Sequence, residues 1–151
     1  MVLSKTCIYG IRATLFVATQ EADKYVPINR AAEALGISFH FLTKILQTLT
    51  QQNIMQSYRG PNGGIALAKP ADSIYLGEII RAIDGTNLFS ACILGLPGCG
   101  ELKPCPLHEQ WAGIRGDIAK MFNQTTVSEM AKRVRERGLR LTDVEWNFLT
   151  S

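Results

Sequence analysis

The sequence lacks any long apolar run. Its 151 residues contain no stretch of about 18 apolar side chains, so we expect no membrane-spanning helix and no membrane partner. The N-terminus also lacks the basic segment, the apolar core and the small-residue cleavage site of a secretory signal. We therefore expect a cytoplasmic protein, in which thiols stay reduced and disulfides are rare.

Charge is sparse and unevenly distributed. Charged residues make up 19% of the chain, and the formal net charge is +3. Residues 1–70 carry seven basic and three acidic side chains, whereas residues 71–151 carry nine basic and ten acidic ones. A positive N-terminal half beside a nearly neutral remainder favours a nucleic acid as partner.

Signatures of catalysis are absent as well. No glycine-rich loop has the spacing of a phosphate site, and no nucleophile is accompanied by a base and by a group that would orient that base. The adjacent Gly63 and Gly64 belong to a turn. We therefore predict that the chain is not an enzyme.

The first fifty residues have the pattern of a helix-turn-helix. Apolar residues recur at three- and four-residue steps along residues 3–19, which predicts an amphipathic helix. A short helical pattern over residues 29–35 ends at Gly36, and Ser38 can cap a further helix that runs to about residue 52. The second helix of such a pair enters the major groove of DNA. Its exposed N-terminal part supplies four candidate DNA contacts, which are Ser38, His40, Thr43 and Lys44. For His40, exposure to solvent alone is an equal alternative.

A β-wing is predicted next. Residues 54–59 and 64–69 are two short extended runs, and the glycine-rich segment between them has the chemistry of a hairpin turn. Arg59 lies at the base of this wing, where an arginine can enter a narrow minor groove or simply pair with a phosphate. Asn62 and Gly63 in the turn are further candidate DNA contacts.

The C-terminal half predicts three helices and a loop. Residues 74–83 form a helix that Gly85 ends, and Pro106 suits the first turn of a helix whose apolar stripe runs from residue 107 to residue 122. Nothing else in this half can cover that stripe, so we expect it to pack on a second copy of the chain. Thr125 or Thr126 can cap a last helix, and Glu129, three residues after Thr126, would form a capping box with it.

These patterns predict a mainly α fold with a small β-wing. A winged helix-turn-helix head would occupy residues 1–84 and a cysteine-rich loop residues 85–105. A long dimerisation helix and a C-terminal helix would follow over residues 106–137, with a tail over residues 138–151. Trp146 and Phe148 in this tail would either dock on a partner or be disordered.

Three of the four cysteines lie in that loop. Cys92, Cys99 and Cys105 are separated by six and five residues, and His108 follows the last of them. This donor set suits an iron–sulfur cluster or a structural zinc ion. The spacings favour the cluster, because the first pair of zinc ligands is usually separated by two to four residues. Unligated redox thiols are a third alternative. Cys7 lies on the apolar stripe of the first helix, which favours a place in the core.

Four motifs occur in order along the chain: L-S-K-T-C-I-Y-G-I-R-A, R-G-P-N-G-G-I-A-L-A-K-P, I-Y-L-G-E-I-I-R-A-I-D-G and C-P-L-H-E-Q-W. Together they resemble the Rrf2 family of bacterial winged-helix regulators over residues 1–137, and most closely its iron–sulfur cluster regulator (IscR-like) branch. The resemblance implies a homodimeric transcriptional regulator that binds a double-stranded DNA operator. Its long C-terminal helices would cross at the dimer interface, and it would sense iron–sulfur, redox or nitric oxide status.

The resemblance also implies a ligand set. In the IscR-like branch a two-iron, two-sulfur cluster, here favoured over a four-iron type, is held at the positions of Cys92, Cys99, Cys105 and His108. In the nitric-oxide-sensing branch the fourth ligand is an aspartate of the partner's first helix, at the position of Ile8. The absence of a carboxylate there favours His108 and leaves Cys7 as an outside candidate.

Two features depart from the IscR-like branch. The first cysteine spacing is one residue longer, and Thr43 stands where a glutamate helps to discriminate operators, so no operator sequence is transferred. The alternative function is a cluster-free or zinc-containing regulator that responds to a small molecule or a partner protein.

Overall fold

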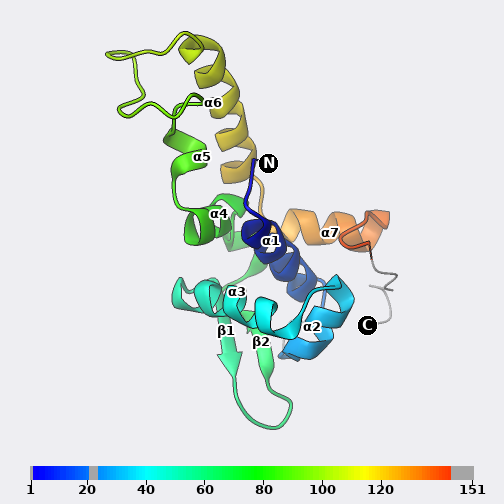
Figure 1. Cartoon of the computed structure of the whole chain (residues 1–151). Helices are drawn as coiled ribbons and strands as arrows, with labels where there is room; N and C mark the ends of the chain where they lie inside the picture. The colour runs from blue at the N-terminus through cyan, green and yellow to red at the C-terminus, as the bar shows by residue number, and fades with distance from the viewer. Residues whose placement is uncertain (1, 21–23, 144–151) are drawn as a thin grey trace.

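Seven α-helices, a 3₁₀ helix and a two-stranded sheet make up residues 2–20 and 24–143, the part of the chain that the computed structural model describes (Figure 1). The mainly α fold with a small β-wing is confirmed. Helix α1 (Lys5–Ala18) begins after Ser4, whose hydroxyl accepts a hydrogen bond from the N–H of Cys7. It crosses the head and packs against α3, α4 and α7, so its buried side, which includes Phe16, forms the centre of the core.

The helix-turn-helix is confirmed. Helix α2 (Ile28–Leu35) ends at Gly36, whose φ of 67° is left-handed. Helix α3 (Phe39–Gln51) begins after Ser38, whose hydroxyl accepts the N–H of Phe41 at 3.2 Å. Four apolar side chains anchor α3 in the core, and they are Leu42, Ile45, Leu46 and Leu49. The opposite face of α3 is left exposed.

The wing is a hairpin of β1 (Met55–Tyr58) and β2 (Gly64–Leu67), paired antiparallel with Met55 opposite Leu67. It is shorter than the two runs in the sequence. Its base is tied to the head by an isolated bridge between Val26 and Ile65, with N···O distances of 2.7 and 2.8 Å. A Cβ at Gly64 would lie 2.0 Å from the Val26 carbonyl oxygen, so the bridge requires glycine there. The wing tip projects from the head (Figure 1).

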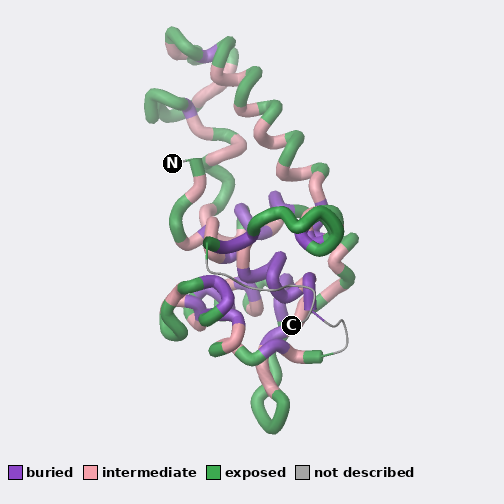
Figure 2. The backbone as a smooth tube through the Cα atoms, turned by 90° about the vertical axis from the view of Figure 1, so that its right-hand side faces the viewer, coloured by how far each residue is buried: buried purple, intermediate pink, exposed green. Residues whose placement is uncertain are grey.

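An arm leaves the head after α4 (Leu76–Asp84), which follows the 3₁₀ helix η1 (Ala71–Ser73). The arm consists of α5 (Asn87–Ser90), the cysteine loop and α6 (His108–Gln124). The one-turn helix α5 was not expected inside the loop, and α6 begins at His108 rather than at Pro106, so the placement of Pro106 in its first turn is wrong. Buried residues are concentrated in the head (Figure 2), and His108 is the one buried residue of α6.

Helix α7 (Val127–Arg137) returns to the head. At its start, the N–H of Val127 donates a hydrogen bond of 2.8 Å to the carbonyl oxygen of Ile74. Thr126 and Glu129 exchange hydrogen bonds of 3.1 Å in the expected capping box. Leu141 beyond the helix is buried too, whereas Trp146 and Phe148 lie outside the described residues. Within the described residues, no helix is both long and apolar enough to cross a membrane.

Candidate DNA interface and metal-binding loop

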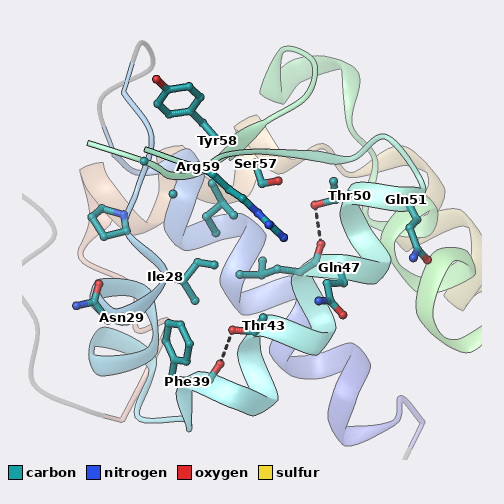
Figure 3. A pocket seen from close by; sticks show the side chains of 15 residues that line it. Ile28, Asn29, Phe39, Thr43, Gln47, Thr50, Gln51, Ser57, Tyr58 and Arg59 are labelled. Atoms are coloured by element: carbon teal, nitrogen blue, oxygen red, sulfur yellow. Dashed lines mark hydrogen bonds between the residues drawn. The ribbon is translucent and has the colours of Figure 1, made fainter. Parts of the chain in front are cut away.

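A groove of about 710 Å³ lies between α3 and the wing (Figure 3). Leu46 and Ile65 contribute apolar surface to it, and Thr43, Gln47 and Arg59 contribute polar groups. Arg59 follows the last residue of β1, and its side chain extends across the groove toward α3 (Figure 3). No acidic side chain of the described residues forms an ion pair with Arg59. Its guanidinium is therefore available to a phosphate or to a base edge.

The structure brings together some of the predicted contacts and separates others. Thr43, Arg59 and Gly63 line the same groove, whereas Asn62 lines a neighbouring hollow beside the wing. The Thr43 hydroxyl donates to the carbonyl of Phe39 at 2.7 Å, which leaves its lone pairs and its methyl group for a partner. The Ser38 hydroxyl already accepts a hydrogen bond as the cap of α3. His40 and Lys44 are exposed on the first turns of the same helix.

Several polar residues of this groove were not selected from the sequence, among them Gln47, Gln51 and Ser57. Gln47 and Gln51 lie one and two turns beyond Thr43 on α3, and Ser57 lies on β1. The helical period of 3.6 residues could have revealed the two glutamines, because steps of four keep them on the face of Thr43. Ser57 had no comparable signal in the sequence.

The cysteine loop gathers its donors at the start of α6. The Cys99 Sγ lies 3.7 Å from the His108 Nδ1, and the Cys92 thiol interacts with the thiols of Cys99 and Cys105. Cys92 and His108 are buried, whereas Cys99 and Cys105 are half-buried. All four predicted ligands are thus linked to one another in pairs.

Two of these thiols have shifted pKa values. The pKa of Cys92 is lowered, chiefly because the backbone N–H of Leu96 and then that of Leu94 donate to its sulfur. The pKa of Cys105 is raised, chiefly by burial, and contact with Cys92 raises it further. Cys92 is therefore the more readily ionised member of this pair, and the thiolate is the form that binds metals.

Helix α6 also holds the chain that leads into the loop. The indole Nε1 of Trp111 donates to the carbonyl of Ala91 at 2.9 Å. The Arg115 Nη1 lies 3.0 Å from the carbonyl oxygen of Ser90, 3.1 Å from that of Ala91 and 3.4 Å from the Cys99 Sγ. Arg115 was not identified from the sequence, and Trp111 belongs to the apolar stripe of residues 107–122 that was expected to pack on a second copy.

The donors gather in pairs, which is an arrangement that a two-iron cluster can use. Within residues 2–20 and 24–143, no three His, Cys, Asp or Glu side chains are arranged to hold one metal ion. A tetrahedral metal with one sulfur and one nitrogen ligand separates the two by about 3.6 Å, close to the 3.7 Å between Cys99 and His108. In a two-iron cluster with four protein ligands each iron takes two of them, and imidazole can replace thiolate.

Comparison with known proteins identifies relatives over most of the chain. The profile of the Rrf2 family, described as an iron-dependent transcriptional regulator, matches residues 3–133. The HTH-type transcriptional regulator IscR of Yersinia pseudotuberculosis serotype O:1b (strain IP 31758) is 32% identical over 122 residues, which are 81% of this chain and 74% of that protein.

Solved structures share the fold. The structure of CymR, the global cysteine regulator of B. subtilis, superposes with a TM-score of 0.75 at 24% identity, covering 86% of this chain and 95% of that chain. The structure of T. potens IscR gives a TM-score of 0.73 at 22% identity and covers 91% of each chain. At these identities, the likeness establishes the winged-helix architecture alone.

Proposed function

The chain belongs to the Rrf2 family of transcriptional regulators, and we propose that it is a cytoplasmic, homodimeric DNA-binding regulator that senses iron–sulfur, redox or nitric oxide status through an iron–sulfur cluster. The observation that carries this proposal is the pairwise convergence of Cys92, Cys99, Cys105 and His108 at the first turn of α6. The cluster held there would supply a centre that changes with oxidation, iron supply or nitric oxide.

The four ligands have distinct roles in this proposal. Three thiolates supply soft, negatively charged donors, and His108 supplies one neutral nitrogen, which raises the potential relative to an all-cysteine site. The backbone N–H groups of Leu96 and Leu94 favour the thiolate of Cys92, so this residue would bind metal with the least competition from protons. The buried position of His108 limits the access of water to the site.

The head would meet DNA through α3 and the wing. Helix α3 presents Thr43 and Gln47 beside the groove, where a recognition helix contacts base edges in the major groove. Arg59 would enter the adjacent minor groove, and the exposed Lys44 would contact phosphate. We retain the four segments defined from the sequence, with residues 1–84 as the DNA-binding head, as part of this proposal.

A second copy of the chain would cover α6. Ile114 and Met121 are 54% and 55% exposed, and they lie seven residues apart on one face of the helix. Large apolar side chains at this spacing are typical of a helix that packs on another helix. Two heads joined through α6 would place two copies of α3 on one duplex.

Anaerobic purification tests the cluster directly. We expect the wild-type protein to contain iron and acid-labile sulfide, to absorb visible light and to give an electron spin resonance signal after reduction. His108→Ala removes the nitrogen ligand and should change that signal, since imidazole and thiolate impose different electronic environments on iron. Cys7→Ala should leave it unchanged, because Cys7 is buried in the head.

DNA binding is measured on the same preparations. Each form is titrated against fragments selected by the protein from a random pool, at fixed salt. A cluster sensor requires different affinities of the cluster-loaded and cluster-free forms for the selected DNA. Colourless protein without iron, prepared without exposure to oxygen, would refute the cluster.

A cluster-free or zinc-containing regulator that responds to a small molecule or a partner protein is the second candidate. It is favoured by the likeness in fold to a regulator described as a global cysteine regulator. Stoichiometric zinc, or protein that contains no metal and still binds the selected DNA, would support it over the cluster sensor.

A further inference from the structure

Arg115 is the basic residue that connects α6 to the cysteine loop. Its Nη1 is within hydrogen-bonding distance of two carbonyl oxygens at the end of α5 and of the Cys99 Sγ. The same Cys99 sulfur lies 3.7 Å from the His108 Nδ1. Arg115 and His108 therefore approach one sulfur from two turns of the same helix.

The charge of Arg115 has no acidic counterpart in the described structure. No carboxylate of residues 2–20 or 24–143 forms an ion pair with it, although the side chain is half-buried. Its neighbours are two neutral carbonyl groups and one thiol. A partly buried cation without a counter-ion is costly, and a charged sulfur at Cys99 would remove that cost.

We propose that Arg115 is a positioning residue that fixes Cys99 as a ligand and raises the reduction potential of the bound cluster. This inference depends on the cluster of the proposed function. A guanidinium beside a ligand sulfur favours the more negative, reduced state of a cluster, because the added electron increases the attraction between them. The hydrogen bonds to Ser90 and Ala91 hold the guanidinium in place for that contact.

The test is a redox titration of the cluster in the full-length protein. Reduced dye donates one electron to the oxidised cluster, and visible absorption reports the fraction reduced. We expect Arg115→Gln to raise the ratio of oxidised to reduced cluster about tenfold at a fixed ambient potential, which corresponds to about 59 mV for one electron. Arg115→Lys retains the positive charge and should bring that ratio most of the way back to the wild-type value.

Lys120→Gln is the matched control, because it removes the same charge from an exposed position five residues further along α6. Its titration should coincide with that of the wild type. The inference is overturned if Arg115→Gln keeps the wild-type ratio or if Arg115→Lys shifts as far as Arg115→Gln. Loss of the cluster from the Arg115 variants, while Lys120→Gln retains it, supports the role of Arg115 in fixing Cys99 as a ligand. A wild-type protein without a cluster refutes the proposed function itself, whereas a loaded wild type with unshifted variants refutes only the role of Arg115.

Discussion

Cys7 and Cys92 carry the same thiol in opposite surroundings. Burial in the head, with Asp84 adding a negative charge and a hydrogen bond, raises the pKa of Cys7 to about 12. Backbone N–H groups of the loop lower the pKa of Cys92. Cys7 consequently stays protonated and apolar in the core, which argues against it as a metal ligand, while Cys92 has the thiolate character that metal binding needs.

Arg59→Ala should weaken binding to a selected operator by about 1–3 kcal/mol and non-specific binding by less. The physical reason is that Arg59 points into the groove between wing and α3, where minor-groove width and base edges depend on sequence. Titrations against operator and scrambled duplexes at several salt concentrations measure both losses.

Lys44→Ala is the control for this experiment, since Lys44 is exposed on α3 and does not line the groove. It should weaken both kinds of binding to a similar degree and lower the salt slope by about one. If Arg59→Ala lost the same affinity for both duplexes, Arg59 would contact phosphate without contributing to specificity.

Single residues could be predicted from the sequence where local chemistry selects them. The spacing of Cys92, Cys99 and Cys105 indicated metal ligands, and the turn after Arg59 placed that residue at the base of the wing. Arg115 could not be found in this way, because its contact with Cys99 spans 16 residues and depends on how α6 packs beside the loop. No periodic pattern in the sequence encodes such a contact.

At the scale of elements, the Glu78 side chain connects the segment after the wing to the start of α4. Glu78 accepts a hydrogen bond from the N–H of Tyr75 at 2.8 Å and pairs with Lys69 at 2.6 Å. Burial alone would raise the pKa of Glu78, but the hydrogen bonds from Lys69 and Tyr75 outweigh it, and the pKa is lowered. The charged form of Glu78 therefore stabilises the fold.

Glu78→Gln should lower the free energy of unfolding at pH 7 by about 1 kcal/mol, as is typical for loss of a helix-capping interaction. Because the pKa of Glu78 is lower in the folded protein, its carboxylate contributes to the free energy of unfolding at pH values above the unfolded-state pKa, near 4.5. That contribution is lost as the pH falls through the folded-state pKa. The difference between variant and wild type should therefore shrink in acid. Urea unfolding at pH 7 and at a series of values below 4.5 measures it.

Glu136→Gln provides the comparison, because Glu136 is exposed on α7 and forms no ion pair within the described residues. Its free energy of unfolding should stay within about 0.5 kcal/mol of the wild type. A Glu78 variant as stable as this control at pH 7 would show that the link between wing and α4 contributes nothing measurable.

Helices with capping signals were predicted well, and those without them were not. Gly36, Ser38 and Thr126 mark the ends of helices in the sequence and in the structure. Helix α5 has four residues, too few for a period of 3.6 residues to be recognised. A proline is compatible with the first turn of a helix but does not make a helix start there, so Pro106 could not fix where α6 begins.

For the whole molecule, the sequence predicted a head and an exposed apolar helix but not the path of the chain between them. Helix α7 packs against α1, and Val127, Ala131 and Val134 are buried. Their spacing indicates a buried face without indicating which surface covers it. Helix α6 is consequently connected to the head at both ends, through α4 and α5 at one end and through α7 at the other (Figure 1).

Ile114→Glu should convert the protein from a dimer to a monomer at micromolar concentration. Each large apolar side chain buried on association contributes about 1.5–3 kcal/mol, and a charge at the same place would be buried without a partner. The fold of the monomer should tolerate this change, because Ile114 is 54% exposed. Sedimentation equilibrium measures the mass, and circular dichroism confirms the helices.

Lys120→Glu introduces the same side chain on an exposed polar position of α6 and should leave the dimer intact. The affinity for the operator depends on whether the protein is a dimer or a monomer. A monomer places one copy of α3 on one half-site and leaves the second half-site empty, so Ile114→Glu should bind a full operator no more tightly than a half-site. A dimeric Ile114→Glu protein would show that another surface joins the two copies. In that case the exposed apolar face of α6 would need a different partner, and the cysteine loop at its start would not be coupled to the dimer.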